Sequence, residues 1–436
     1  MNTPLVVTYP RISMKIKLVV FTLLCYVQQA QAQTSPADTS LRWQAGYLDI
    51  HHINTGRGNS TFFIFPDGTT MLLDAGDLNA TPFLRKNAPL KVAPARPNDS
   101  QTAGQWIIDY VKQTMPAGRS PQLDYLVVSH FHADHYGDLT ERNKPESGRS
   151  FQRTGITEVG DVLPVKTIID RGYPAYAFPV DLRNYYNEEG STFLNYVAFV
   201  DAKVKQGAKA EMLKAGSRQQ IVLRQQPATY PAFRVQNVKV NGTIWTGKGS
   251  ETFAHFTADS VLNKQGKFNE NPLCMAFTFS YGPFDYFTGA DNTGLRGYGM
   301  PHWFDTETPM AKAVGPVDVM TLNHHGNRDA SNETFLNTLN PTVAVQQSWC
   351  SDQPGQEVMH RLGTLPKGQK RDAFALHLLP ESKTYLGFWL NQIYRSTEGH
   401  VLIRVLPGGR QYWVGVLDDT NPTLTVKRWH GPYMSR

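Results

Sequence analysis

Four side chains that could bind metal follow one apolar run of the sequence. The run Leu123–Ser129 is typical of a buried strand, and the next six residues read HFHADH. In an extended or turning backbone His130 and His132 share a face, so both imidazoles can reach one ion. Asp134 and His135 fall in the next turn, where they can reach a second ion beside the first. Imidazole and carboxylate ligands together suit zinc or a similar divalent metal. The stretch therefore predicts a metal site rather than a solvated loop.

Two later segments add ligands of the same kind. Tyr286–Asn292 reads as a strand end that finishes in Asp291, whose two carboxylate oxygens can bridge two cations. Val319–Ser331 carries the pair His324 and His325 directly after a strand-like run. Either segment alone would be a weak signal, because an aspartate after Gly-Ala is usually a turn. Three strands that end in metal-ligand chemistry together predict one metal centre.

Strand and helix patterns show which elements must position these side chains. Apolar runs bounded by turn residues predict strands, and apolar residues at helical spacing predict helices. Clusters of strands with helices between them are typical of an α/β sandwich in which helices cover two sheets. No linker clearly divides the chain, so residues 33–436 are predicted to form a single domain. The predicted strands are Gly46–Ile53, Ser60–Phe65, Thr69–Leu73, Leu123–Ser129, Val165–Ile169, Phe233–Val240, Leu273–Ser280, Phe284–Thr288, Val317–Leu322, Thr342–Gln346, Val401–Val405 and Gln411–Val416, and the predicted helices are Ser100–Met115, Ser191–Gln206 and Asn332–Leu339.

The N-terminal composition predicts export. Residues 14–32 have two lysines, an apolar centre and an Ala-Gln-Ala ending, so residues 1–32 are predicted to be a secretory signal peptide. The apolar run Leu18–Val27 is too short to span a bilayer, and no later stretch approaches the required length. The mature chain would carry 40 basic against 37 acidic residues, a balance that does not favour a stable nucleic-acid partner. We expect a periplasmic or extracellular protein without a transmembrane segment. Its two remaining cysteines, Cys274 and Cys350, could form at most one bridge.

Several motifs resemble one superfamily. HFHADH is similar to the HxHxDH motif of the metallo-β-lactamase superfamily, and LLDAGD (Leu72–Asp77) is similar to its early strand-Asp-Gly motif. Gly56–Asp77, Asn269–Asp291 and Leu322–Ser348 resemble the hydrolase domain of ComEC-like competence proteins and the related phosphorylcholine esterases. The resemblance spans most of residues 46–348 and is loose in a predicted insertion around residues 139–268. It implies a metallo-β-lactamase-type αββα sandwich of two mixed β-sheets flanked by helices. The membrane channel of the competence proteins is absent, so DNA uptake is not implied.

The resemblance also implies a dizinc-type site, with manganese as the alternative metal. The implied ligands are His130 and His132 for one ion, Asp134 and His135 for the other, Asp291 as the bridge, and His324 with His325 closing the site. Asp134 and the histidine pair are also the predicted catalytic residues, and Asp74 would be a structural acid under the metal loop. Adjacent residues usually point apart, so we expect one histidine of the pair on metal and the other near substrate, without a preference between them. A histidine that usually precedes the bridging aspartate is replaced here by Asn269-Glu270-Asn271, so the first ion is expected to be weakly held, with His255 an outside candidate.

This chemistry predicts a hydrolase. A two-metal centre lowers the pKa of bound water towards about 7, so a metal-bound hydroxide can act as nucleophile without a serine or cysteine. The resemblance favours a phosphodiester substrate, small or oligomeric, whereas the spacing alone supports only metal-dependent hydrolysis. A carbonyl hydrolase of the lactonase or β-lactamase type is the alternative, and cations near Arg171 and Arg328 would favour phosphate over it. A non-catalytic metal-binding protein on the same scaffold is a remote alternative, and an oxidoreductase of the flavodiiron kind is less favoured again.

Two stretches are candidates for the substrate-binding wall. Arg171–Pro179, with Tyr185 and Tyr186, could form an aromatic wall over the metals, or could pack as part of its own core. Trp349 and Asp352 follow a strand near the site and could line the pocket.

Overall fold

The computed structural model describes residues 41–140, 143, 146–188, 190–294 and 299–436. The predicted signal peptide, residues 1–32, lies outside the described residues. Leu41–Arg436 form one compact unit. Within the described ranges, no helix combines the length and apolar character that a membrane crossing needs.

Two sheets of nine strands each form the centre of this unit. The order of the first sheet is β18-β17-β16-β1-β2-β3-β4-β5-β6, and that of the second is β15-β14-β13-β12-β11-β10-β7-β8-β9. Both sheets mix parallel and antiparallel neighbours; for example, β2 pairs antiparallel with β1, and β3 pairs parallel with β4. The strands are β1 (Leu48–His52), β2 (Thr61–Ile64), β3 (Thr70–Leu73), β4 (Leu123–Val127), β5 (Val165–Asp170), β6 (Lys209–Met212), β7 (Phe233–Val240), β8 (Thr243–Trp245), β9 (Thr252–Ala254), β10 (Ala276–Tyr281), β11 (Phe284–Thr288), β12 (Val319–Thr321), β13 (Val343–Gln346), β14 (Asp372–Ala375), β15 (Tyr394–Ser396), β16 (His400–Val405), β17 (Gln411–Leu417) and β18 (Val426–Met434).

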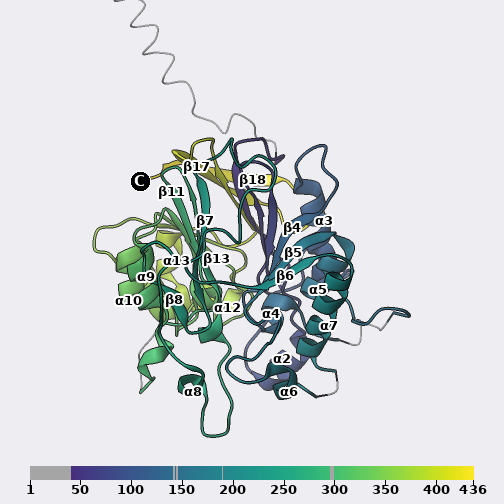
Figure 1. The fold of residues 1–436 in the computed structure, drawn as a ribbon. Helices are drawn as coiled ribbons and strands as arrows, with labels where there is room; N and C mark the ends of the chain where they lie inside the picture. Colours follow the sequence, from purple (N-terminus) through teal and green to yellow (C-terminus); the bar gives the residue numbers. More distant parts are fainter. Residues whose placement is uncertain (1–40, 141–142, 144–145, 189, 295–298) are drawn as a thin grey trace, which may run out of the picture. The chain divides into compact units, whose positions relative to one another are not determined.

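Helices cover the outer face of each sheet. Figure 1 shows α3, α5 and α7 beside the first sheet and α9 and α10 beside the second. α3 illustrates how such a helix forms, because Thr102 accepts the N–H of Gln105 as a cap and Ile107 and Val111 are buried on one face. The helices are α2 (Ala80–Lys86), α3 (Ala103–Thr114), α4 (Ala133–Tyr136), α5 (Gly155–Val162), α6 (Leu182–Tyr185), α7 (Thr192–Lys205), α8 (Ala258–Val261), α9 (Glu307–Val314), α10 (Glu333–Leu339), α11 (Gln356–Thr364), α12 (Pro380–Leu386) and α13 (Phe388–Ile393), with short 3₁₀ turns η1 (Asn271–Leu273), η2 (His302–Phe304) and η3 (Asn323–Gly326).

Alternation along the strands produces a core of three apolar layers. Phe63 of β2 packs between the two sheets, stacked on Phe279 of β10 with ring centroids 4.5 Å apart. Its neighbour Phe62 points to the other face, into the layer under α3 and α7, because successive strand residues face opposite sides. A third layer fills the space under α9, α10 and α11. The molecule is therefore an αββα sandwich of two mixed sheets, as the sequence predicted.

The segment 139–268, which the sequence predicts to be an insertion, contributes strands to both sheets. It supplies β5 and β6 at one edge of the first sheet, and β7, β8 and β9 at one edge of the second. The central strands of the sandwich are therefore framed by this segment on one side and by the C-terminal strands on the other.

The strand directions bring the predicted site residues together. β3 and β4 are parallel in the first sheet, and β11, β12 and β13 are parallel in the second. Parallel strands end at the same edge of a sheet, where open α/β sheets place ligands. The ligand-type residues follow β3, β4, β11 and β12, so both sheets contribute to one site.

Candidate metal centre

Asp74 holds the loop that follows β4. Its Oδ1 accepts the N–H of Ser129 at 2.7 Å, and its Oδ2 accepts the Ser129 hydroxyl at 2.7 Å and lies 2.8 Å from Nδ1 of His135. Asp74 has a φ of +63°, a strained backbone conformation that lets a residue directly after β3 turn its carboxylate under the loop. Asp74 therefore links Ser129 and the ring of His135 beneath this loop.

Acceptors behind the imidazoles orient several of the histidines. Nδ1 of His135 faces Asp74, Nδ1 of His325 lies 3.0 Å from the carbonyl oxygen of Gln347, and Nδ1 of His324 lies 2.5 Å from Asp329. An acceptor at Nδ1 fixes a proton there and leaves Nε2 free to act as a ligand, as in carboxylate–histidine–metal arrangements. These histidines therefore present Nε2 to the site.

Four ligand-type residues form one cluster, which we call the second group: Asp134, His135, Asp291 and His325. All four are buried, and their ligand atoms lie within 4.8 Å of one another. Nε2 of His325 is 2.9 Å from Asp134 Oδ2 and 3.4 Å from Asp291 Oδ2. Nε2 of His135 is 3.1 Å from Asp291 Oδ1.

The first group consists of His130, His132 and Asp291. Nε2 of His130 lies 3.1 Å from Nδ1 of His132 and 3.8 Å from Asp291 Oδ2. Asp291 belongs to both groups, with one oxygen towards His135 and the other towards His130 and His325. This is the arrangement that a bridging carboxylate requires.

Buried polar atoms of the two groups fit a pair of cations. Nε2 of His135 and Oδ1 of Asp291 are buried without an aligned hydrogen bond, although they lie 3.1 Å apart. Buried polar atoms are normally paired, so such atoms need an explanation. The donor set of imidazole nitrogens and carboxylate oxygens is the one that zinc and similar divalent ions bind. The residues present therefore form a cluster that could bind metal.

Electrostatics keep the carboxylates of the cluster ionised. Burial raises the pKa of Asp134, but the neighbouring His135 and His325 outweigh it and lower that pKa to about 2. Burial also opposes ionisation of Asp291, yet His325 and His135 hold its pKa well below the usual value. Both acids are thus in the charged form that a metal needs.

Protons balance these charges when no cation is bound. Burial lowers the pKa of His325, but Asp291 and the hydrogen bond to Asp134 raise it to about 10. Burial, with His135 as the next cause, holds the pKa of His130 well below its usual range, so this imidazole is neutral. A cation in the second group would take the place of the proton that His325 carries.

The structure distinguishes the two histidines of the pair. His325 belongs to the second group, whereas His324 belongs to neither group and its side chain is 19% exposed. Nε2 of His324 lies 3.1 Å from the side-chain nitrogen of Asn271 and 3.9 Å from Asp291 Oδ2. Both histidines have left-handed backbones, with φ of +47° and +57°, which lets adjacent side chains point to different places.

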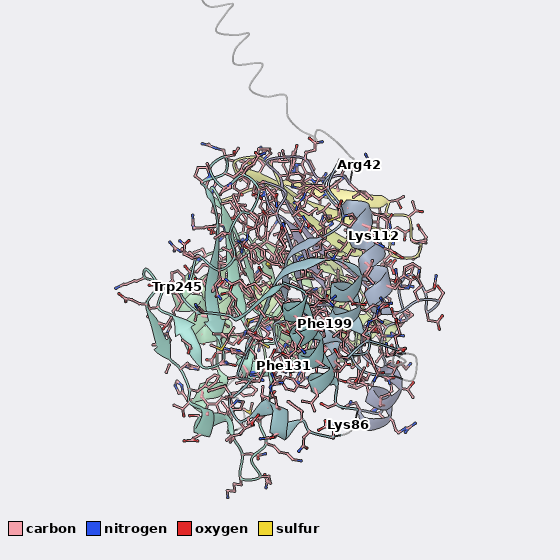
Figure 2. All side chains as sticks on the ribbon, turned by 45° about the vertical axis from the view of Figure 1, so that its right-hand side comes forward. Arg42, Lys86, Lys112, Phe131, Phe199 and Trp245 are labelled. Atoms are coloured by element: carbon pink, nitrogen blue, oxygen red, sulfur yellow. The ribbon has the colours of Figure 1, made fainter. Side chains whose placement is uncertain are left out.

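A pocket of about 550 Å³ opens over the cluster. Apolar lining residues lie on α2, beside it and after β13, and we call them the apolar wall: Leu78, Pro82, Phe83, Leu90, Trp349 and Cys350. Polar side chains of the cluster also line the pocket. Lys86, which is labelled in Figure 2, is the single lysine or arginine among the lining residues that the structure describes. The lining residues used below are Leu78, Pro82, Phe83, Lys86, Leu90, Asp134, Asn271, Asp291, His324, His325, Trp349 and Asp352. Trp349 and Asp352 thus line the pocket, as the sequence suggested.

Arg171 and Arg328, near which cations would favour a phosphate substrate, do not line this pocket. Arg171 is fully buried and forms two 2.6 Å contacts with Glu270, whose Oε1 also accepts the N–H of Phe131. Arg328 is 71% exposed and lies outside the lining. The pair therefore gives no support to phosphate over a carbonyl substrate.

The stretch proposed as an aromatic wall packs into its own core instead. Tyr176 is fully buried against Phe193, and Tyr185 and Tyr186 pack on Phe268 and Phe193. None of the three tyrosines lines the 550 Å³ pocket. His255 belongs to neither metal group.

Cys274 and Cys350, the cysteines of the described residues, are buried free thiols, and one of them borders the pocket. Cys274 is fully buried and Cys350 lines the apolar wall. Burial raises the pKa of Cys350 to about 12, so its thiol stays protonated and is not a nucleophile.

Sequence reasoning missed several residues of the site. Phe83 and Lys86 lie on α2, a helix with no buried residues and hence no apolar periodicity to reveal it. Asp329 and the carbonyl of Gln347 act only through contacts made in the folded chain. Of these missed residues, only Asn271 was noticed in the sequence. It lies in the stretch that replaces a histidine usual in the superfamily that the chain resembles.

No family model and no curated protein matches the chain. Among solved structures, the chain is similar to Zn²⁺-bound PqqB from Methylobacterium extorquens, at 11% identity and a TM-score of 0.31, covering 61% of this chain and 59% of that chain. It is similar to the metallo-β-lactamase fold protein YhfI from Bacillus subtilis, at 10% identity and a TM-score of 0.33, covering 82% of this chain and 99% of that chain. It is also similar to a CmlA β-hydroxylase variant, at 11% identity and a TM-score of 0.36, covering 86% of this chain and 55% of that chain. Likenesses this distant carry no argument about activity, and the fold class rests on the two-sheet topology.

Proposed function

We propose that this chain is an exported hydrolase that uses two divalent metal ions, zinc first and manganese as the alternative. The observation that carries the proposal is the sharing of Asp291 between two buried clusters of ligands at the floor of one pocket. The first group would hold one ion and the second group the other, with Asp291 between them. Bound ions of this kind lower the pKa of water and polarise the bond to be cleaved.

Different side chains of the site would bind the metal and the substrate. Asp134 and His325 hold their ligand atoms 2.9 Å apart in the second group, so His325 is the metal-binding member of the histidine pair. His324 lines the pocket, and although burial lowers the pKa of its imidazole, Asp291 and the hydrogen bond to Asp329 raise that pKa. In the protonated form, its Nε2–H would donate a hydrogen bond to an oxygen of the substrate. Asn271 is next to that nitrogen and would position the same oxygen.

A phosphodiester is the proposed substrate class. The resemblance of three segments to ComEC-like and phosphorylcholine-esterase-like domains supports it, and Lys86 supplies one cation to the pocket. A carbonyl substrate is the second candidate, favoured by the apolar wall and by the placement of Arg171 and Arg328 outside the lining. Export to the periplasm or the extracellular space is part of the proposal and rests on the composition of residues 1–32.

Hydrolysis assays test the reaction class. The purified chain, loaded with zinc or manganese, would be compared with chelated protein on bis(p-nitrophenyl) phosphate, a p-nitrophenyl carboxylic ester, a lactone and a chromogenic β-lactam. We expect metal-dependent cleavage of the diester that falls to background in Asp134→Ala. The matched control is Asp109→Ala, since Asp109 lies on α3 outside the pocket.

The outcomes separate the candidates. Metal-dependent cleavage of the ester, lactone or β-lactam, without diester cleavage, would establish the carbonyl alternative. Two bound metals without turnover of any substrate would favour the remote alternative, a metal-binding protein that is not an enzyme. Absence of bound metal would overturn the proposal.

A further inference from the structure

Trp349 is held rigidly beside the second group. It follows β13, and only 6% of the residue is exposed. Its backbone N–H donates to Oε1 of Gln353 at 2.8 Å, and its backbone carbonyl accepts the N–H of Ala93 at 2.7 Å. Its ring packs edge-on against Phe83, with centroids 5.1 Å apart. The backbone and the ring plane are therefore both fixed by contacts with separate segments.

The indole N–H of Trp349 points at a predicted metal ligand. Nε1 lies 3.1 Å from Oδ2 of Asp134 and 3.4 Å from Nε2 of His325. The indole nitrogen can only donate, so the oxygen of Asp134 is the acceptor of this bond. The ring also packs edge-on against His325, with centroids 5.7 Å apart. Trp349 thus contacts two members of the second group at once.

A neutral donor suits this position. A lysine or arginine there would bring a positive charge that repels a metal ion, whereas an indole stabilises the carboxylate without adding charge. The contact also joins the two sheets, because Asp134 follows β4 of the first sheet and Trp349 follows β13 of the second. With a cation on His325, the indole N–H would remain the donor that keeps Asp134 Oδ2 in place.

We infer that Trp349 is a positioning residue for Asp134: its indole N–H sets the orientation of the carboxylate and thereby the affinity of the second group for metal. The inference rests on the proposed function, since it requires that the second group binds a metal ion. Outer-shell partners of metal ligands typically change affinity by about 10- to 100-fold when they are removed.

The test is zinc binding by Trp349→Phe. Phenylalanine keeps an aromatic ring against Phe83 and His325 but removes the N–H. The control is Trp245→Phe. Trp245 lies on β8 and is similarly buried, and its indole N–H donates to the carbonyl of Gly249 at 3.0 Å. Figure 2 labels Trp245 on the opposite side of the view from Lys86, which lines the metal pocket.

Zinc stoichiometry and affinity would be measured on the full chain by competition with a chromophoric chelator. We expect Trp349→Phe to bind one zinc as wild type does and the other about 10- to 100-fold more weakly, while Trp245→Phe matches wild type. Affinities of Trp349→Phe within about threefold of wild type at both positions would overturn the inference and leave the proposed function intact. Wild-type protein that binds no zinc would overturn both.

A spectroscopic measurement on wild-type protein does not depend on the variant folding. The chain has eight tryptophans, and ¹⁵N-indole labelling reports each N–H separately. We expect the resonance of one indole, other than the one that Trp245→Phe removes, to shift as zinc fills the second group. Zinc saturation at both positions with no indole resonance moving would contradict the contact with Asp134.

Discussion

At the scale of single residues, the histidines of the metal groups are oriented by atoms on the side away from the site. His135 and His325 each have an oxygen acceptor at Nδ1, so each offers Nε2 to the cluster. Ser129 extends the pattern, since its hydroxyl donates to Asp74 and lies 3.1 Å from Nδ1 of His130. The ligand-type atoms of the candidate site are therefore oriented partly by residues that belong to neither group.

Asp74→Asn tests this orientation. An amide keeps one acceptor oxygen, but its NH₂ group faces either the backbone N–H of Ser129, in place of Oδ1, or both Ser129 Oγ and His135 Nδ1, in place of Oδ2. A donor at Nδ1 favours the tautomer with a proton on Nε2, which blocks the ligand atom. We expect zinc affinity to fall about 10- to 100-fold, measured by chelator competition.

The control for this variant is Asp67→Asn. Asp67 is also buried and accepts the N–H groups of Thr69, Gln225 and Gln226, but belongs to neither metal group. If both variants changed zinc affinity equally, loss of stability rather than loss of orientation would be the cause.

At the scale of elements, the apolar patterns of the sequence predicted the central strands better than the edge strands of the sheets. The predicted bounds of Phe233–Val240 and Phe284–Thr288 agree with β7 and β11, because apolar runs between turn residues mark strands that are buried. The strands β6 and β18, at the two edges of the first sheet, were not predicted. β18 reads VKRWHGPYM and is largely exposed, so no apolar run identifies it.

The same reasoning explains which parts of the site were predictable. The stretch His130–His135 is a local motif, and Asp291 and His325 end neighbouring strands, so their chemistry is visible along the chain. The indole N–H of Trp349 meets Asp134 across 215 positions of sequence, and no local pattern encodes that contact. The proposed roles of His325 at the metal and His324 in the pocket likewise depend on left-handed backbone angles.

Glu270→Gln tests how one element supports the metal loop. Glu270 precedes η1 and joins the end of β5, through Arg171, to the loop after β4, through the N–H of Phe131. Arg171 and Glu270 are 0% and 3% exposed, so neutralising the acid leaves a buried guanidinium without its charge partner. We expect the free energy of unfolding in urea to fall by about 3–5 kcal/mol.

A double variant, Arg171→Met with Glu270→Leu, is the matched comparison for Glu270→Gln. Removing both charges avoids the unpaired ion, so this variant should recover part or all of the loss. A cost below about 1 kcal/mol for Glu270→Gln would show that water or another group compensates for Arg171.

At the scale of the whole molecule, the candidate site joins the two sheets. Asp134 and His135 follow a strand of the first sheet, and Asp291 and His325 follow strands of the second. A cation bound by all four would exist only in the folded state, so it stabilises that state by linkage. We expect zinc at 100 times its dissociation constant to raise the free energy of unfolding by about 2.7 kcal/mol per ion, measured in urea.

Asp291→Asn provides the comparison for zinc stabilisation, because Asp291 belongs to both groups. The variant should show little stabilisation by zinc, and a chelator should return wild-type protein to its metal-free stability. An equal gain in wild type and variant would mean that the stabilising zinc binds elsewhere.

His400 makes the metal-free fold sensitive to acid. Nδ1 of His400, on β16, accepts the N–H of Asn54 at 2.9 Å, so the ring must be neutral, and burial lowers its pKa to about 3. The unfolded chain has a histidine pKa near 6.5, so between these values it binds more protons than the folded chain. The stability that neutral His400 contributes is therefore fully present above about pH 6.5 and is lost as the pH decreases towards about 3.

In the presence of chelator, we expect wild type to lose about 2 kcal/mol more than His400→Gln between about pH 7 and about pH 5, measured by urea unfolding at each pH. Glutamine can still accept the Asn54 N–H but does not titrate, and other buried histidines such as His52 contribute equally to both proteins. Equal losses in the two proteins would mean that folding does not lower the pKa of His400.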